Sequence, residues 1–254
     1  MKWFQTPWFI FGLIALVFLG YGASVELDWW IFKDKDLNQS GTFGDSFGVL
    51  TSLFSALAFG GLMITIWQQQ KDLSLTREEM KNQQFENMLF KMLEVHASIV
   101  TDMDFRSKKL NNQQTVTGRD CFTVFLKRLS AHYHFYEKKN SARPEVEIIE
   151  QAYQYFWPKN RNNLSHYFRY VYNIFKFIEA SGRDDKKDYA NIVRAQLSDY
   201  ELVVLFYNCL SKHGRDRFKP LAIKYSLFDN MPKDLLIRQS HDSLYPAKAY
   251  GGEH

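Results

Sequence analysis

The sequence has few cysteines and none of the common catalytic motifs. Cys121 and Cys209 are the only two in 254 residues, which excludes a disulfide framework or a thiolate metal site and indicates a reducing compartment. No Walker loop, no G-x-S-x-G motif and no His–Glu metal spacing is present. His132 and His134 are two residues apart, so a helix would point them to different faces. The residues therefore predict no catalytic residue, no metal ligand, no cofactor and no small-molecule substrate.

Charge is absent from two long stretches near the start of the chain. Residues 3–25 and 46–70 contain no Asp, Glu, Lys or Arg, and each run can cross a bilayer core about 30 Å thick as a helix. The first run lacks the basic start of a secretory signal, which favours an uncleaved helix over a signal peptide. We expect residues 1–70 to form a transmembrane hairpin, with helices near residues 5–25 and 46–68.

Basic residues flank the outer ends of this hairpin. Lys2 precedes the first helix, and Lys71, Arg77 and Lys81 follow the second, whereas the connection 26–45 is acidic. Lys and Arg beside membrane helices favour the cytoplasmic side. Both termini are therefore predicted to lie in the cytoplasm, with the lipid bilayer as a partner of the hairpin.

Small residues recur at every fourth position of the second membrane helix. This helix-packing seam consists of Gly44, Gly48, Ser52, Ala56 and Gly60. Such a ladder allows another helix to approach closely, and it predicts that hairpins associate into a homo-oligomer. Small residues are also common in membrane helices that have no such contact.

The polar remainder predicts an all-α cytosolic part. Residues 71–100 contain neither Pro nor Gly and are expected to form one long, stalk-like helix, either in a coiled coil between chains or packed on its own domain. Residues 101–254 are expected to form a helical domain, because no extended strand-like alternation occurs. The expected elements are a loop over 107–119 and helices over 120–136, 145–157, 163–180 and 189–210, with Pro158 ending the second helix and a break near Leu197 in the last.

The candidate sensing or partner surface consists of basic and aromatic residues in the second half of the chain. Arg169 and Arg194 lie in aromatic-rich helices, where a buried guanidinium must be paired or stacked; a structural ion pair with Asp199 or Glu201 explains them equally well. The densest basic run, 212–219, suits contact with RNA, DNA or phospholipid, but a solvated turn explains it too. The candidate residues are Tyr167, Arg169, Arg194, Lys212, Arg215 and Arg217.

Three patterns resemble those of the putative phage abortive infection family. They are Gly41-x-Phe43-Gly44-Asp45-x-Phe47-Gly48; Tyr167-Phe168-Arg169 with Tyr172; and Arg194-Ala195-Gln196-Leu197-Ser198 followed by Glu201-Leu202 and Phe206-Tyr207-Asn208. Members resemble one another in having two membrane helices and a helical cytosolic domain, and some resemble the two-helix effectors of retron defence systems. The resemblance implies a bacterial inner-membrane protein and, for a retron-associated member, a reverse transcriptase with its RNA or DNA as partners. It does not extend to residues 99–160.

Three functions follow from these observations. The leading one is a membrane-anchored defence effector, whose cytosolic domain detects a partner or signal and whose hairpins disrupt the membrane or arrest growth. The second is a membrane-tethered nucleic-acid-processing enzyme, because a site assembled from scattered Asp, Glu and His leaves no motif in a sequence. The third is a scaffold that holds a defence partner at the membrane.

Overall fold

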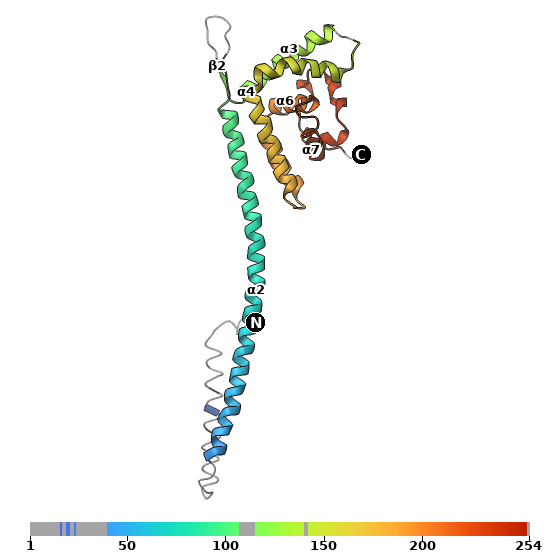
Figure 1. The fold of residues 1–254 in the computed structure, drawn as a ribbon. Coiled ribbons are helices and arrows are strands. Elements are labelled where there is room, and N and C mark those ends of the chain that lie inside the picture. Colours follow the sequence, from blue (N-terminus) through green and yellow to red (C-terminus); the bar gives the residue numbers. More distant parts are fainter. Residues whose placement is uncertain are drawn as a thin grey trace. The chain divides into compact units, whose positions relative to one another are not determined.

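The computed structural model describes residues 16, 19, 20, 23, 40–106, 115–139 and 142–252. Most of the first predicted membrane helix and the connection over residues 26–39 therefore lie outside the described residues. The chain divides into two compact units, Met1–Arg77 and Glu78–His254, and each is described by itself. The described elements are mostly helical, in agreement with the predicted class (Figure 1).

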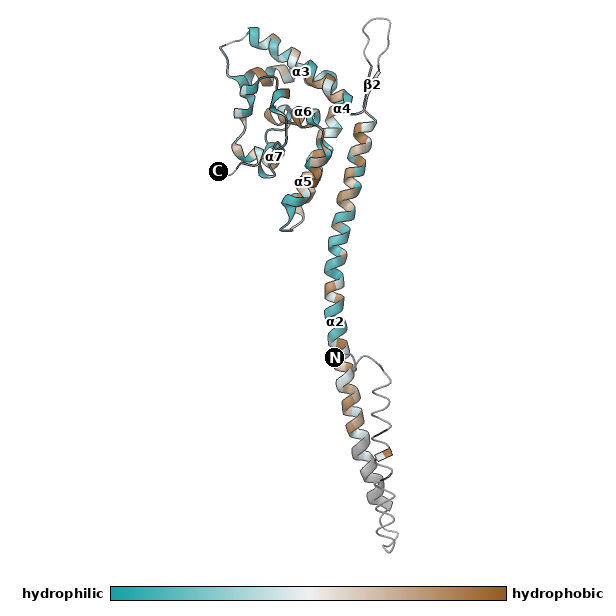
Figure 2. Ribbon diagram, turned by 180° about the vertical axis from the view of Figure 1, so that it is seen from behind, coloured by the Kyte–Doolittle hydropathy of each residue, from teal (hydrophilic) through white to brown (hydrophobic). Residues whose placement is uncertain are grey.

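Helix α2, Ser40–Thr101, contains both the second predicted membrane helix and the predicted stalk without a break. Its segment Thr51–Thr101 includes a window long and apolar enough to cross a membrane, and that window is not buried inside the chain. Leu57, Phe59 and Ile64 are each more than 60% exposed. Figure 2 shows this hydrophobic stretch giving way to a hydrophilic one further along α2. Apolar surface of this extent requires a cover such as lipid or another helix.

The last turns of α2 pack within the second unit. Leu89, Leu93 and Val100 belong to its hydrophobic core, and the Phe85 ring stacks on Phe177 with centroids 4.9 Å apart. Of the two interpretations of this helix, packing on its own domain therefore describes its final segment.

A two-stranded hairpin follows α2, and its second strand corrects the loop predicted over residues 107–119 at residues 115–117 only. Strands β1, Asp104–Arg106, and β2, Thr115–Thr117, pair antiparallel with Phe105 opposite Val116. Three-residue strands are too short to show the alternation that identifies a strand in a sequence. Residues 107–114 lie outside the described residues.

Helix α3, Asp120–Lys139, confirms the helix predicted to begin at Asp120. It packs on α4, Glu145–Ala180, which contains Pro158 in its interior. The prediction that Pro158 ends a helix was wrong. A proline removes one backbone hydrogen bond and displaces the preceding turn, but the buried residues Phe156 and Leu164 anchor α4 in the core on both sides of it. Figure 1 shows α4 bending along its length, as proline within a helix usually causes.

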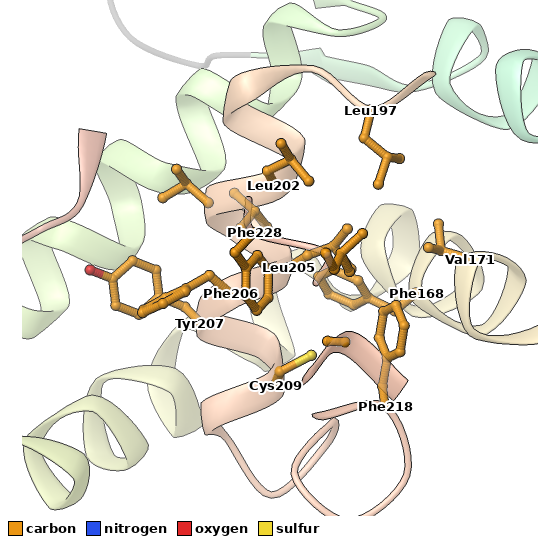
Figure 3. Packing of buried hydrophobic residues seen from close by; sticks show 14 of the residues in the cluster. Phe168, Val171, Leu197, Leu202, Leu205, Phe206, Tyr207, Cys209, Phe218 and Phe228 are labelled. Atoms are coloured by element: carbon orange, nitrogen blue, oxygen red, sulfur yellow. The ribbon is translucent and has the colours of Figure 1, made fainter. Parts of the chain in front are cut away.

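The break predicted near Leu197 is confirmed. Helix α5, Lys186–Gln196, ends there, and α6, Asp199–Leu210, begins with a capping box in which the Glu201 carboxylate accepts the Ser198 backbone N–H. All side chains from Glu201 to Leu210 are buried, as expected for a helix surrounded by other elements. Figure 3 shows α6 side chains packed with Phe168, Phe218 and Phe228.

The chain after α6 consists of short elements. Helix α7 covers Lys219–Lys224, and three 3-10 turns follow, η3 Lys233–Leu235, η4 Gln239–Leu244 and η5 Ala247–Tyr250. The apolar side chains Leu227, Phe228 and Tyr245, which lie between these elements, complete the core around α6.

Candidate functional site

A groove formed by α4 and the turn that follows α6 is a candidate ligand-binding site. It consists of two adjoining cavities, of about 230 and 420 Å³, which share Trp157, Ser165 and Arg169. The remaining lining residues of the first are Phe168, Tyr172, Asn208, His213, Gly214, Arg217 and Phe218, and those of the second are Arg161, Asn162 and His166. We call these residues together the α4 groove.

One face of α4 supplies the wall of the α4 groove. Trp157, Arg161, Ser165 and Arg169 follow one another at intervals of four residues, so their side chains lie above one another on a helix. The continuous helix through Pro158 places Trp157 in register with the three residues that follow. The groove therefore depends on α4 remaining a single helix.

The opposite wall depends on a close backbone approach at Gly214. A Cβ atom at this position would lie 2.7 Å from the Asn208 side-chain oxygen and 2.8 Å from its backbone oxygen. Asn208 cannot easily move, since its amide donates a 2.7 Å hydrogen bond to the buried Tyr153 hydroxyl. Glycine thus allows the turn carrying His213 and Arg217 to fold tightly against α6.

Positive charge dominates the α4 groove. Arg161, Arg169 and Arg217 line it, and no Asp or Glu is among the lining residues. Arg169 is held in place by the Ser165 carbonyl at 3.2 Å and hydroxyl at 3.3 Å. Burial lowers the pKa of the neighbouring His213, and the charge of Lys212 lowers it further, so the imidazole is neutral near pH 7. Charge without a local counter-charge favours an anionic ligand.

Aromatic rings line the same groove. The Trp157 indole stacks on the His213 imidazole with centroids 4.4 Å apart and lies nearly parallel to Phe168 at 6.1 Å. Tyr172 meets Phe218 edge to face at 6.2 Å. The groove therefore combines guanidinium groups with flat apolar surface.

The residues of the predicted sensing or partner surface lie in several different parts of the second unit. Arg169 and Arg217 line the α4 groove. Tyr167 is fully buried, and Arg194 pairs with Asp229 at 3.0 Å rather than with Asp199 or Glu201.

The remaining two basic residues of the predicted surface, Lys212 and Arg215, both contact Glu150. Its carboxylate accepts hydrogen bonds from the Arg215 guanidinium at 3.0 Å and from the Lys212 backbone N–H at 2.9 Å. Arg215 also donates to the Leu210 carbonyl and so fastens the end of α6. Arg215 thus fixes the turn to α4 and α6, and both Lys212 and Arg215 are exposed.

Sequence reasoning missed Trp157, Arg161 and His166. The four-residue spacing from Trp157 to Arg169 was available as a signal, but dividing α4 at Pro158 placed Trp157 in a different helix from the arginines. His213 belonged to the basic run already noted.

Two polar clusters in the core complete the set of candidates. Tyr167 donates a 2.8 Å hydrogen bond to the buried Glu201 carboxylate, and His96 of α2 lies 3.5 Å from the same carboxylate. Burial raises the pKa of Glu201, but the nearby His96 imidazole and hydrogen bonds from Ser198 and Tyr167 outweigh it, so its pKa is lowered overall. Glu201 is therefore ionised at neutral pH.

The second cluster surrounds His241. The Ile237 N–H donates to the Tyr207 hydroxyl, so that hydroxyl directs its own proton to His241 Nδ1 at 2.8 Å. His241 Nε2 then carries the proton that faces the Glu145 carboxylate. All these polar atoms are used within the fold, so the cluster acts as a structural brace between α4 and η4.

Comparison with known proteins agrees with the resemblance inferred from the sequence. Residues 159–236 match the model of the family described as putative phage abortive infection protein. The matched segment includes most of the α4 groove and all of α5, α6 and α7. No curated protein and no solved structure matches the chain. The family's name associates the chain with abortive infection.

Proposed function

We propose that the chain is a membrane-anchored effector of a bacterial anti-phage system. The observation that carries this proposal is the match of residues 159–236 to an abortive infection family, on a chain whose α2 has a window suited to a membrane. In this proposal the second unit detects an infection signal, and the apolar segment acts in the inner membrane with both termini in the cytoplasm.

The path from signal to membrane runs through α2. The helix is continuous from Ser40 to Thr101, and its last turns hold core residues such as Leu89. A signal that changes the packing of those turns acts on the same helix that carries the apolar segment. The hairpins then associate along the seam of small residues.

The membrane effect is leakage or growth arrest rather than a wide aqueous channel. No charged residue lies within residues 46–70 to line such a channel. Small polar side chains of the seam and disturbed lipid would provide the conducting path. A second copy of the chain is the partner that this mechanism needs, and a reverse transcriptase with its RNA or DNA is the partner of a retron-associated member.

Controlled expression tests this proposal. We expect expression of the chain to depolarise the inner membrane and halt growth, and Ala56→Leu in the seam to abolish both effects at equal protein level. Loss of toxicity only with substitutions of Asp, Glu or His in the second unit would instead support a tethered enzyme. A chain that is never toxic, even with its neighbouring genes and phage, would support a scaffold.

Topology is tested by reporter fusions. A reporter active only outside the cytoplasm should work after Asn38 and fail after Leu110, because Lys2, Lys71 and Arg77 flank the cytoplasmic ends. The reverse pattern would contradict a cytoplasmic sensor.

A further inference from the structure

The two cavities of the α4 groove differ in chemistry although they adjoin. The first presents mainly rings, with Trp157, Tyr172 and Phe218 in its lining. The second presents mainly polar groups, with Arg161 and His166. Pockets that enclose a whole organic ligand have volumes of roughly 300–1,000 Å³. The first cavity is smaller than this, and the second is open to solvent. A ligand with one flat apolar part and one anionic part would fill both.

The cationic part is prepared for an anion. Among the residues that the structure describes, Arg161, Arg169 and Arg217 make no ion pair with a carboxylate, in contrast to Arg194 and Arg215. The hydrogen bonds from Arg169 to Ser165 fix its guanidinium at the boundary of the two cavities. Planar guanidinium groups bind phosphate oxygens through paired hydrogen bonds.

The aromatic part is prepared for a flat ring. Trp157 is only partly buried, and its stack with His213 holds the indole in one orientation. His213 is uncharged near pH 7, since burial lowers its pKa, and it therefore adds flat surface rather than charge. Nucleobases stack on such surfaces without regard to sequence.

We infer that the α4 groove binds a nucleotide, with the phosphate on Arg161, Arg169 and Arg217 and the base against the exposed side of the Trp157–His213 stack. The ligand is a free mononucleotide or the phosphorylated end of a single-stranded nucleic acid, which share this chemistry. This inference deepens the proposed function, because it names the signal that the second unit detects. Only the biological role of the bound nucleotide rests on the proposed function. Binding is measured on purified protein, so its failure is distinct from a failure of toxicity.

The test uses the full-length protein in detergent. Binding of AMP is measured by calorimetry, and binding of a short fluorescent oligodeoxythymidine with a 5′ phosphate is measured by anisotropy over a range of salt concentrations. Inorganic phosphate and phosphatidylglycerol vesicles serve as competitors. We expect saturable binding of at least one nucleotide ligand; tighter binding of AMP identifies a free nucleotide, and tighter binding of the oligonucleotide identifies a strand end.

Matched variants assign the binding to the groove. Arg169→Gln and Arg217→Gln should each weaken binding about tenfold, the usual effect of losing one charge-assisted hydrogen bond, and each should lower the salt slope for the oligonucleotide by about one. Trp157→Leu should weaken nucleotide binding but leave the salt dependence of oligonucleotide binding unchanged. Lys176→Gln removes a charge from an exposed position of α4 outside the groove and should change nothing. Thermal unfolding confirms that each variant is folded.

Three results would overturn the inference. One is wild-type affinity in folded Arg169→Gln and Arg217→Gln. Another is competition by inorganic phosphate as effective as that by AMP, which would remove the role of the base. The third is binding to phosphatidylglycerol vesicles alone, which would make the groove a lipid-contacting surface.

Discussion

His96 Nε2 of α2 lies 3.5 Å from the Glu201 carboxylate at the start of α6, and both side chains are almost completely buried. Glu201 also accepts hydrogen bonds from Tyr167 and Ser198, at 2.8 Å each. One carboxylate therefore joins α2, α4 and the α5–α6 junction. The end of the long helix is fastened to the centre of the second unit through this contact.

Removing one donor from this carboxylate should destabilise the second unit. Tyr167→Phe leaves the ring in place but removes the hydroxyl, and a lost hydrogen bond to a buried charge costs about 1.5–3 kcal/mol. We expect a decrease of that size in the free energy of unfolding, measured with urea. Asp199→Asn, at an exposed position of α6 near Glu201, is the control and should be nearly neutral. An unchanged midpoint in Tyr167→Phe would contradict the assigned role of Glu201.

Acid should destabilise the second unit partly through His241. Burial lowers the pKa of His241 below its usual value of 6.5, although Glu145 and Glu137 oppose this and Arg238 adds to it. The unfolded chain then binds a proton at a higher pH than the folded chain, so stability falls as the pH decreases below 6.5. Unfolding midpoints measured from pH 7.5 to 5.5 test this.

The variant His241→Gln isolates the contribution of that residue. It should be less stable than the wild type at pH 7.5, because it disrupts the contacts with Tyr207 and Glu145, but its stability should decrease less between pH 7.5 and 5.5. An equally steep decrease in the variant would assign the acid sensitivity to other groups.

The core around α6 should tolerate truncation poorly. Phe206 is fully buried and Phe168 is 7% exposed, and Phe→Ala in a core typically costs about 3–5 kcal/mol. Phe206→Ala should therefore lower the amount of protein in cells and its protease resistance. Exposed Phe135 provides a control, since Phe135→Ala removes the same ring without leaving a cavity. Equal abundance of the two variants would show that the α6 face is not a core.

Elements with long, regular patterns were predictable from the sequence. The apolar face of 163–180 and the start of α6 at Ser198 agree with the structure because helical spacing and capping are local properties. The prediction that Pro158 ends a helix was wrong because it depends on contacts that are not local. Whether a helix continues through a proline depends on the core contacts on either side, such as those of Phe156, and these are not visible in a sequence.

The α4 groove was predictable only in part. Arg169 and Arg217 were candidates from their charge, but the sequence did not show that they share a cavity, since they lie 48 positions apart. Arg194 and Arg215 have the same charge, and only the positions of Asp229 and Glu150 in the structure show that they form ion pairs. The partner of a charge is a tertiary property, so composition cannot distinguish a free guanidinium from a paired one.

The seam of small residues gives the last prediction. Gly48 and Gly60 lie in α2, and a Cβ atom built at either position meets no atom of the described residues within 4 Å. A larger side chain at these positions therefore meets no described part of the chain, and we attribute a loss of function to contact with another helix once an effect of helix propensity has been excluded. Ala56, in the middle of the seam, is also exposed.

Gly48→Leu should abolish toxicity while the amount of protein in the membrane stays unchanged, because leucine keeps the span hydrophobic but prevents close helix approach. Leu62→Ile is the control outside the seam and should leave toxicity nearly unchanged. Cross-linking in membranes should show fewer oligomers for Gly48→Leu only.

Leucine also favours a helix by about 1 kcal/mol relative to glycine, so Gly48→Ala provides a second control that raises helix propensity with a small side chain. If Gly48→Ala and Gly48→Leu are equally inactive, the effect comes from stiffening the helix; if both remain fully toxic, the seam does not mediate association.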